Sequence, residues 1–224
     1  MENRIFSFIV MLLLWGSPTV TTAQGDAKLS FVETNKAENE LRKRFKEFAK
    51  IIKEVGSSDS GLSDEEKSAR IDNDAPLLFW EYPKRKMTVI YSGRPSNTMA
   101  MRRYLYNLKK QSIEISNIRS YDLELINSFF SNGDSRGWKF KEVNDHGDSI
   151  FTRLVEFRQT YVKVNLGKLR REEPGARYSE VDRKLLEVLL IKSASVSKYG
   201  TNYKPKILLG DVKAKEHPQR TNNK

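Results

Sequence analysis

The stretch KLLEVLLIKSASVSKYGTNYKPKILLGDVKAKE, residues 184–216, decides the fold because it contains two apolar runs separated by a polar loop. Each run is rich in branched aliphatic residues and is bounded by polar segments, which is typical of two strands joined as a hairpin. The runs carry apolar residues on both faces. This is expected of a sheet that is covered on one face and packs against another part of the structure on the other. The sequence therefore predicts an antiparallel sheet in the C-terminal half of the chain.

Further strands are predicted upstream, where β-branched and aromatic residues alternate with polar ones between turn segments. They are LLFWEY (77–82), MTVIYS (87–92), YDLELI (121–126), WKFKEV (138–143) and the long IFTRLVEFRQTYVKVN (150–165). The segment GKLRREEPGARYSE (167–180), which separates the long strand from the final hairpin, is predicted to be a loop.

Helices are predicted in the N-terminal half, where apolar residues recur at three- and four-residue spacing. One helix is expected at 35–56, capped by Thr34 or Asn35 and ended by Gly56. Its apolar stripe consists of Leu41, Phe45, Phe48, Ile52 and Val55. A short helix follows the capping-box pair Ser63 and Glu66. A third is expected at 94–111, with Met101, Tyr104, Leu105 and Leu108 on one face. Helices first and long strands afterwards indicate an α+β fold, with the helices on one face of a sheet.

The domain organisation is predicted from the two ends of the chain. Residues 1–23 resemble an export signal, with Arg4 before a short apolar run and small residues before Gln24; cleavage is favoured over an uncleaved anchor. A flexible start at 24–33, a single α+β domain at 34–216 and a basic tail at 217–224 follow. No later stretch approaches the length of a membrane span. The protein is therefore expected to be exported, to a periplasm or to the outside.

Composition restricts the chemistry. The 224 residues include no cysteine, which excludes thiol nucleophiles, thiolate zinc sites and disulfides. The net charge of +11 raises affinity for polyanions such as nucleic acid or anionic glycans. The basic residues are spread along the whole chain, which favours a solvated surface over a dedicated polyanion-binding patch.

The order and pattern of four segments resemble the NTF2-like superfamily, more narrowly the exported NTF2-like domains of undefined role found in Bacteroidetes. The segments are NTMAMRRYLYNLKK, IEISNIRSYDLELI, YSEVDRKLLEVLLIK and KPKILLGDVKAKE. The resemblance implies a cone in which a strongly curved antiparallel sheet wraps around N-terminal helices and leaves a pocket. Such folds serve isomerases, dehydratases, transport factors and non-catalytic domains, so the resemblance assigns no activity and no catalytic residue.

Two carboxylates are the candidates for catalysis. Glu187 lies in one apolar run of the final hairpin, and Asp211 is expected to share a face with Ile207 and Leu209 in the other. If the hairpin register brings the two together, burial and like charge would raise a pKa and make a general acid or base. The alternative, which we favour, is a structural role, because Gly210 indicates a bulge and lysines nearby supply partners.

Aromatic residues are the candidates for ligand binding. Trp80, Tyr91, Tyr104, Trp138 and Phe140 could line the pocket of a cone and surround a small apolar ligand. The same residues could fill the core instead, and this is the reading that we favour.

Metal and cofactor chemistry finds no support in the sequence. His146 stands in the turn NDHGDS and His217 in the tail, and neither belongs to a cluster with ligand spacing. There is no glycine-rich phosphate loop of a familiar type. We therefore predict no metal and no cofactor.

The function predicted from the sequence is an exported, non-catalytic NTF2-like domain that binds a partner protein or a small ligand at the cell envelope. Two alternatives stay open. One is an isomerase- or dehydratase-type enzyme that uses a pocket carboxylate, and the other is a polyanion-binding module. A homodimer is compatible with each of these.

Overall fold

The computed structural model describes residues 28–89, 96–115, 118–126, 137–164, 177–193, 205–215 and 219–222. The helices are α1 (Phe31–Gly56), α2 (Asp64–Ala69), α3 (Ala75–Leu78) and α4 (Met101–Lys110). Short π or 3-10 turns accompany them: η1 (Ser58–Ser60), η2 (Arg70–Asp74), η3 (Tyr82–Lys84) and η4 (Gln111–Ile115). The strands are β1 (Lys86–Val89), β2 (Asn97–Ala100), β3 (Ile118–Leu125), β4 (Lys139–Val143), β5 (Ser149–Val164), β6 (Arg177–Lys192), β7 (Lys206–Ala214) and β8 (Gln219–Asn222).

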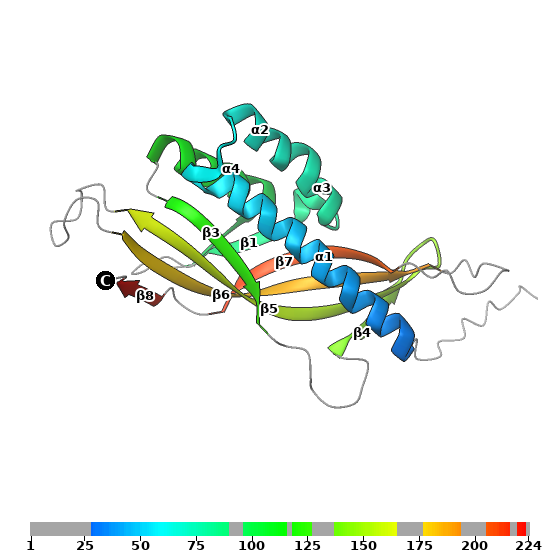
Figure 1. Cartoon of the computed structure of the whole chain (residues 1–224). Helices are drawn as coiled ribbons and strands as arrows, with labels where there is room; N and C mark the ends of the chain where they lie inside the picture. The colour runs from blue at the N-terminus through cyan, green and yellow to red at the C-terminus, as the bar shows by residue number, and fades with distance from the viewer. Residues whose placement is uncertain are drawn as a thin grey trace, which may run out of the picture.

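The strands form one curved, unclosed sheet in the order β2-β1-β7-β6-β5-β3, with β4 paired to β5 and β8 paired to β6. The pairs are antiparallel except for β1 with β7, which is parallel. The long strands β5 and β6 pair over their whole length. In Figure 1, α1 crosses one face of the sheet, and α2, α3 and α4 lie on the same side. The predicted α+β class, with helices on one face of a curved sheet, is confirmed.

Helix α1 begins at Phe31 because Ser30 caps it. The Ser30 hydroxyl accepts a hydrogen bond from the N–H of Glu33, and the Glu33 carboxylate accepts one from the N–H of Ser30. This capping box satisfies two N–H groups reciprocally. The predicted caps, Thr34 and Asn35, lie inside the helix and were wrong by about one turn. The first residues of α1 therefore come from the segment that was predicted to be flexible.

The end of α1 and the start of α2 agree with the sequence. Helix α1 ends at Gly56, and Ser63 and Glu66 form the predicted capping box of α2. The structure adds a second reason for the glycine: a Cβ at Gly56 would lie 2.5 Å from the Cε2 atom of Tyr121 on β3. The absent side chain therefore allows β3 to pack closely against the end of α1.

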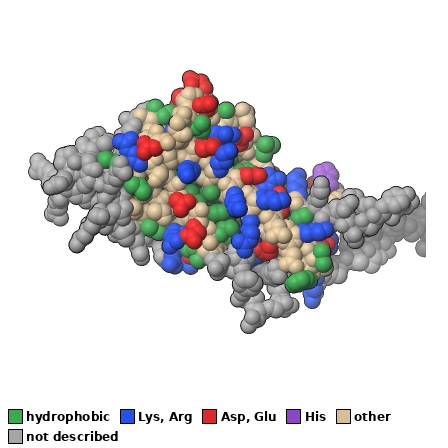
Figure 2. Space-filling view, in the orientation of Figure 1, with side chains coloured by type: hydrophobic (Ala, Val, Ile, Leu, Met, Phe, Trp, Pro, Cys, Tyr) green, Lys and Arg blue, Asp and Glu red, His purple; other side chains and the backbone are tan. Residues whose placement is uncertain are grey.

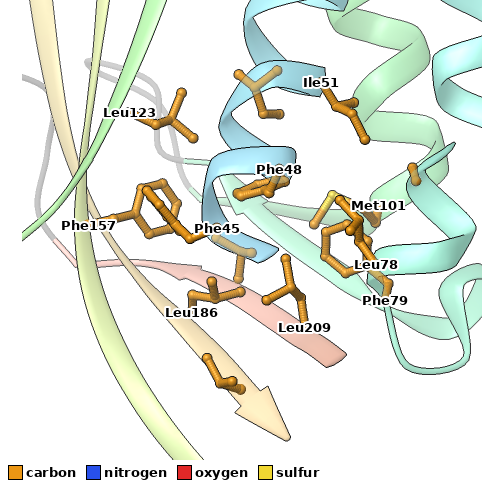
Figure 3. Packing of buried hydrophobic residues seen from close by; sticks show 14 of the residues in the cluster. Phe45, Phe48, Ile51, Leu78, Phe79, Met101, Leu123, Phe157, Leu186 and Leu209 are labelled. Atoms are coloured by element: carbon orange, nitrogen blue, oxygen red, sulfur yellow. The ribbon is translucent and has the colours of Figure 1, made fainter. Parts of the chain in front are cut away.

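The core lies between α1 and the sheet. The predicted stripe of α1 and the predicted face of α4 are buried, which confirms both: Leu41, Phe45, Phe48, Ile52, Val55, Met101, Tyr104, Leu105 and Leu108. The ring of Phe48 contacts Phe79 and Phe157 edge to face, at centroid distances of 5.6 and 6.1 Å. Figure 3 shows Phe45 and Phe48 of α1 facing Phe157 and Leu186 of the sheet. Burial of each such aromatic ring stabilises the fold by about 1.5–3 kcal/mol.

The strand predicted at 77–82 is wrong. Leu78 ends α3. The following residues pair with the sheet through a bridge between Phe79 and Leu209 and a 2.9 Å hydrogen bond from the N–H of Trp80 to the Leu209 carbonyl. Pro76 stands in the first turn of α3, where its fixed φ angle favours a helix. The apolar run supplies core residues from a helical turn, which overrides its β propensity.

Three other boundaries differ from the prediction. The helix expected at 94–111 begins only at Met101, because Asn97–Ala100 pairs with β1 as strand β2. The predicted loop at 167–180 contains the first residues of β6, which continue the pairing with β5 as far as Val164↔Arg177. Within the predicted tail, Gln219–Asn222 forms β8 on β6. In each case a neighbouring strand offers backbone partners that local sequence does not reveal.

Candidate functional site: a polar row on the helix-facing side of the sheet

The two predicted carboxylates meet at one guanidinium group. Arg85 Nη1 lies 3.9 Å from Glu187 Oε2 and 4.0 Å from Asp211 Oδ1. Asp211 Oδ1 also accepts a 2.9 Å hydrogen bond from the N–H of Lys86, and Glu187 Oε2 accepts one of 3.4 Å from the N–H of Asp211. The two acids are therefore close together across the β6–β7 hairpin, which is one of the arrangements that the sequence allowed.

A β-bulge decides which face these acids occupy. The pairing of β6 with β7 shifts register between Leu186 and Val188. Gly210 and Asp211 together therefore oppose Glu187, which is the two-against-one arrangement of a bulge. The extra residue reverses the alternation, so Asp211 leaves the buried face on which strict alternation placed it. The expectation that Asp211 shares a face with Ile207 and Leu209 was wrong.

The surroundings of the two acids indicate an ion-pair cluster that joins strands. Arg85 Nη2 also donates to Glu81 Oε2 at 3.2 Å, so one guanidinium holds carboxylates from three segments. The Glu187 and Asp211 side chains are 26% and 33% exposed. Arg85 lies at ion-pair distance from both acids, and backbone N–H groups donate hydrogen bonds to their carboxylates, as in a structural ion-pair cluster.

The predicted aromatic residues lie in different surroundings. Tyr104 and Trp138 are buried in the core, Trp80 is half-buried, and Phe140 is 41% exposed on β4. Trp138 packs beside Arg153 of β5, with 5.9 Å between the ring centroid and Cζ. Tyr91 lies outside the described residues.

His146 lies in a polar turn. The Asn144 side-chain oxygen accepts hydrogen bonds from the N–H groups of His146 and Asp148, at 3.0 and 2.9 Å. This is the turn chemistry that asparagine supplies, and His146 itself is exposed. His217 lies outside the described residues.

A set of polar residues that the sequence analysis missed continues the core face of the two longest strands. We call it the polar row: Gln159, Tyr161 and Lys163 of β5 with Glu180, Asp182 and Lys184 of β6. The core residues Phe157 and Leu186 occupy the same face, because side chains alternate along an unbroken register. The row begins near the end of α1, since the ring of Tyr161 lies 5.6 Å from that of Tyr121, which packs on Gly56.

The polar row is connected by short contacts. The Tyr161 hydroxyl donates to Glu180 Oε2 at 2.5 Å, and Lys163 Nζ donates to the same oxygen at 2.8 Å. Lys184 Nζ lies 3.3 Å from Asp182 Oδ2. Two cations and two anions thus balance one another within the row.

Burial shifts the pKa values of the inner members in opposite directions. Desolvation raises the pKa of Asp182 above its usual value and lowers that of Lys184, although each partly compensates the other by its charge. Burial also raises the pKa of Tyr161, and the neighbouring Asp182 and Glu180 carboxylates raise it further. Desolvation disfavours each charged form, so the inner part of the row has a low effective dielectric.

Two acceptor atoms in the row are buried without a hydrogen-bond partner. Gln159 Oε1 and Asp182 Oδ1 find no donor in the part of the chain that the structure describes. The two residues pair directly across β5 and β6, and they are only 3% and 6% exposed. Unsatisfied buried acceptors cost about 1–3 kcal/mol each, so such a pair calls for an explanation.

Exposure increases along the row away from the core. The Lys184 and Asp182 side chains are 2% and 9% exposed, whereas those of Lys163 and Glu180 are 21% and 20% exposed. The row therefore has a buried inner end beside the aromatic core and an outer end in contact with solvent.

The signal for the polar row is present in the sequence, but it needs the register. Within β5, the odd-numbered residues change from apolar to polar after Phe157, and within β6 the even-numbered residues do so before Leu186. Only the pairing of β5 with β6 places the two polar segments side by side. A search for alternation along each strand separately does not find them.

A second buried lysine has a structural role. Lys67 Nζ donates to the Ser57 carbonyl and to Ser112 Oγ, both at 2.8 Å, and Ser112 Oγ in turn lies 3.0 Å from the Val55 carbonyl. A serine beside a lysine of lowered pKa is also found at nucleophilic sites. Here both side chains are buried and bind the carbonyls at the end of α1, which identifies them as a helix C-cap.

Comparison with known proteins adds no relative. No protein-family model matches the chain, and no curated protein or solved structure matches it. None of the helices that the structure describes is long and apolar enough to cross a membrane. Among the described residues, no group of three or more His, Cys, Asp or Glu side chains could hold a metal ion.

Proposed function

We propose that this protein is an exported, non-catalytic domain of the NTF2-like type that binds a small ligand at the cell envelope. The curved, unclosed sheet with helices on one face is compatible with such a domain. The ligand binds at the inner end of the polar row, on the face of the sheet where the helices lie. A small ligand is favoured over a protein partner because the two acceptors lie on an inward-facing surface.

One observation carries this proposal, namely the unpaired acceptor atoms of Gln159 and Asp182. A core that served stability alone would gain from apolar residues at these positions, since an unsatisfied buried polar atom costs free energy. A ligand that donates hydrogen bonds removes that cost. Binding sites in proteins combine such convergent polar groups with aromatic neighbours, and the half-buried Tyr161 stands beside these two residues on β5.

An enzyme with a pocket carboxylate is the second candidate, and a specific observation favours it. The pKa of Asp182 is raised by burial, and a carboxyl group with a raised pKa is a feature of general acids and bases. In this alternative Asp182 takes the catalytic role for which Glu187 and Asp211 were candidates in the sequence. The ion pair with Lys184 is a structural explanation of the same residue, so the binding function ranks first.

The polyanion-binding alternative has weaker support. On the face seen in Figure 2, Lys and Arg side chains are interspersed with Asp and Glu side chains. Many basic residues of the described part form ion pairs, as Arg102 does with Asp72 and Arg158 with Glu124. A net charge of +11 is thus not gathered into one patch on this face.

Ligand-observed NMR against a library of small neutral, cationic and anionic compounds tests the proposal. The protein is expressed from its complete coding sequence in a secreting host. We expect compounds that bind the wild type to lose binding in Gln159→Leu. Thr160→Val is the matched control, because Thr160 is the next residue of β5 and faces the other side of the sheet.

Two outcomes would count against the proposal. One is a set of bound compounds that Gln159→Leu leaves unaffected, and the other is a library without any bound compound. The intact mass of the secreted protein tests export in the same preparation. We expect a mature N-terminus at Gln24, and retention of residues 1–23 would contradict the cleaved signal.

A further inference from the structure

We infer that the end of the molecule at which α1 begins docks onto the surface of an anionic lipid bilayer. The docking surface, which we call the apolar tip, consists of exposed apolar side chains from two elements: Phe31 and Val32 of α1 with Phe140 and Val143 of β4. The inference is independent of the ligand site proposed above, because the apolar tip shares no residue with the polar row and lies at the opposite end of α1.

The exposure of the apolar tip is not explained by folding. Phe31, Val32 and Val143 are 71%, 60% and 56% exposed, and Phe140 is 41% exposed. Every residue of β4 is exposed, so this strand adds little to the core. Large apolar side chains that gather on a surface and are rimmed by polar residues mark a place where a protein or a membrane binds.

An ion pair places the first turn of α1 over the end of the sheet that contains β4. Glu33 Oε1 lies 2.8 Å from Lys192 Nζ at the end of β6. Lys192 pairs with Ser149 of β5, and Ser149 pairs with Val143 of β4. Phe140 lies on the helix-facing side of β4, since its ring packs on a core ring of β5 at a centroid distance of 5.8 Å. Figure 1 shows the start of α1 and β4 at this same end of the molecule.

The other flank of α1 carries Phe31 and turns it toward β4. Phe31 and Glu38 are seven residues apart, which places them on the same flank of a helix. The Glu38 carboxylate binds the Arg153 guanidinium of β5. That guanidinium lies 5.9 Å from the centroid of the Trp138 ring, directly before β4. The apolar side chains of α1 and β4 therefore belong to one surface.

Lysines surround the apolar tip. Those that are exposed at the start of α1 and on β4 are Lys28, Lys36, Lys139 and Lys141. The nearby acids are Glu33, which Lys192 binds, and Glu142, which lies 3.8 Å from Lys141. Apolar side chains that enter the interface of a bilayer, together with lysines that contact lipid phosphates, hold proteins at anionic membrane surfaces.

The same lysines disfavour a second copy of the chain as the occupant. Among the strands that the structure describes, β4 pairs with β5 alone, so its other edge is open. Two copies of β4 that paired about a two-fold axis through the middle of the strand would set Lys141 against its own copy. Like charges directly opposite each other are destabilising, and lysines on an edge strand prevent such pairing.

The path of the chain brings the apolar tip to a membrane. The predicted export signal holds its apolar run, residues 5–15, in the membrane while the chain is translocated. Residues 16–27 connect this run to Lys28, and a fully extended connection of this length spans only about 40 Å. Helix α1 begins directly afterwards with Phe31 and Val32. Along the chain, the apolar tip is thus the first part of the folded domain after the membrane segment.

Sedimentation with sucrose-loaded vesicles tests the inference. The protein, secreted from its complete coding sequence, is mixed with vesicles of phosphatidylcholine alone or with added anionic phosphatidylglycerol. We expect binding to the anionic vesicles. Phe31→Ser with Val143→Ser should weaken it about tenfold or more, because two apolar side chains no longer enter the interface. The matched control, Leu77→Ser with Leu154→Ser, changes residues that are 68% and 58% exposed elsewhere and should leave binding within about twofold.

A second pair of variants tests the contribution of charge. Lys139→Gln with Lys141→Gln should weaken binding to the anionic vesicles by about fivefold for each lysine. Lys86→Gln with Lys213→Gln removes the same charge from exposed positions of β1 and β7 and should change binding by less than about twofold.

A fluorescent label locates the contact. The chain has no cysteine, so Val143→Cys and Leu154→Cys each accept a single NBD group. Emission from the label at position 143 should move to shorter wavelength when anionic vesicles are added. The label at position 154, on the other face of the sheet, should not respond. This comparison keeps the test decisive if Phe31→Ser with Val143→Ser fails to fold, and it distinguishes the apolar tip from any retained part of residues 1–23.

Three outcomes would overturn the inference: no binding to anionic vesicles, equal loss of binding in the tip variant and its control, and equal NBD shifts at the two labelled positions. A dimer in sedimentation velocity that Phe31→Ser with Val143→Ser dissociates, without vesicle binding, would assign the apolar tip to a second copy of the chain and overturn it as well. None of these results bears on the Gln159→Leu test of the ligand site, so the two failures are distinguishable.

Discussion

The two halves of the β5–β6 ribbon have the same backbone pairing but differ in their inward-facing side chains. In the half that faces α1, the inward positions include Val155 and Phe157 of β5 and Leu186 of β6, which are fully buried, and Arg153 of β5, which forms an ion pair with Glu38 of α1. In the half toward the C-terminal end of α1, the inward positions hold the polar row. The register between the strands is unbroken from one half to the other. The difference therefore lies in side-chain chemistry and not in the sheet.

This difference separates stability from binding within one structural element. The apolar half buries aromatic rings against α1 and supplies most of the free energy that holds the helix on the sheet. The polar half carries buried charges, which rarely stabilise a fold more than apolar residues of the same size would. A protein that retains buried charges is less stable than one with apolar residues in their place. We therefore expect such charges at a functional site.

The largest expected effect is in the apolar half. Phe48→Ala removes a ring that contacts Phe79 and Phe157, and its site is closed on all sides. We expect a loss of about 4 kcal/mol in the free energy of unfolding, from lost burial and the cavity left behind. Urea denaturation followed by circular dichroism measures it. A loss below about 1 kcal/mol would contradict the assignment of the core to this half.

In the polar half, Lys184→Met should be nearly as damaging. It leaves the Asp182 carboxylate buried without its 3.3 Å partner, and breaking a buried pair costs about 3 kcal/mol or more. Replacing both partners, as Asp182→Leu with Lys184→Met, should return the stability to within about 1 kcal/mol of the wild type. The same denaturation experiment measures the cycle. A double variant as unstable as the single one would mean that the pair itself stabilises the fold.

The boundary between the halves is tested at Gly56. A methyl group there would lie within 3 Å of the Tyr121 ring, and overpacking costs about 1–3 kcal/mol. The gain from replacing glycine in a helix offsets about 0.5–1 kcal/mol of that cost. We expect Gly56→Ala to lower the melting temperature in a scanning calorimeter. With Tyr121→Leu in the background the effect should vanish, and an unchanged effect would locate the cost elsewhere.

The pH dependence of stability distinguishes the halves as well. The pKa of Asp182 is raised above its ordinary value of 3.8, so its contribution to stability is fully present below pH 3.8 and is lost as pH rises through the pKa of the folded state. Lys184→Met removes the opposing cation and should raise this pKa further. The stability of the variant relative to the wild type should therefore fall between pH 4 and pH 8. The Phe48→Ala variant should show a constant difference over the same range.

The smallest expected effect is that of Gln159→Leu without ligand. The substitution removes an unpaired buried acceptor, so we expect stability to stay unchanged or to rise by up to about 1 kcal/mol. Chemical denaturation of the free protein measures it. A loss of more than about 2 kcal/mol would mean that the Gln159 side chain is fully satisfied and holds the strands together, which would remove the basis for a ligand.

Much of the framework could be predicted from local patterns. The apolar stripe of α1, the buried face of α4, the capping box at Ser63 and the final hairpin follow from periodicity and capping chemistry, which act over a few residues. The misses have non-local causes. Residues 77–82 do not form the predicted strand, because their apolar side chains pack in the core from a helical turn and the segment after it. Asn97–Ala100 forms a strand because β1 offers backbone partners. Asp211 changed face because a bulge shifts the register.

The sequence by itself determined the α+β class, the apolar surfaces that meet in the core, and the absence of thiol chemistry. Each follows from residue types and their spacing along one segment. Only the tertiary structure decided that Gln159 and Asp182 stand opposite each other, and that Glu187 and Asp211 gather around Arg85 instead. The physical reason is that a site made from two strands depends on their relative register. That register is set by the pairing and packing of the whole sheet, and not by either strand alone.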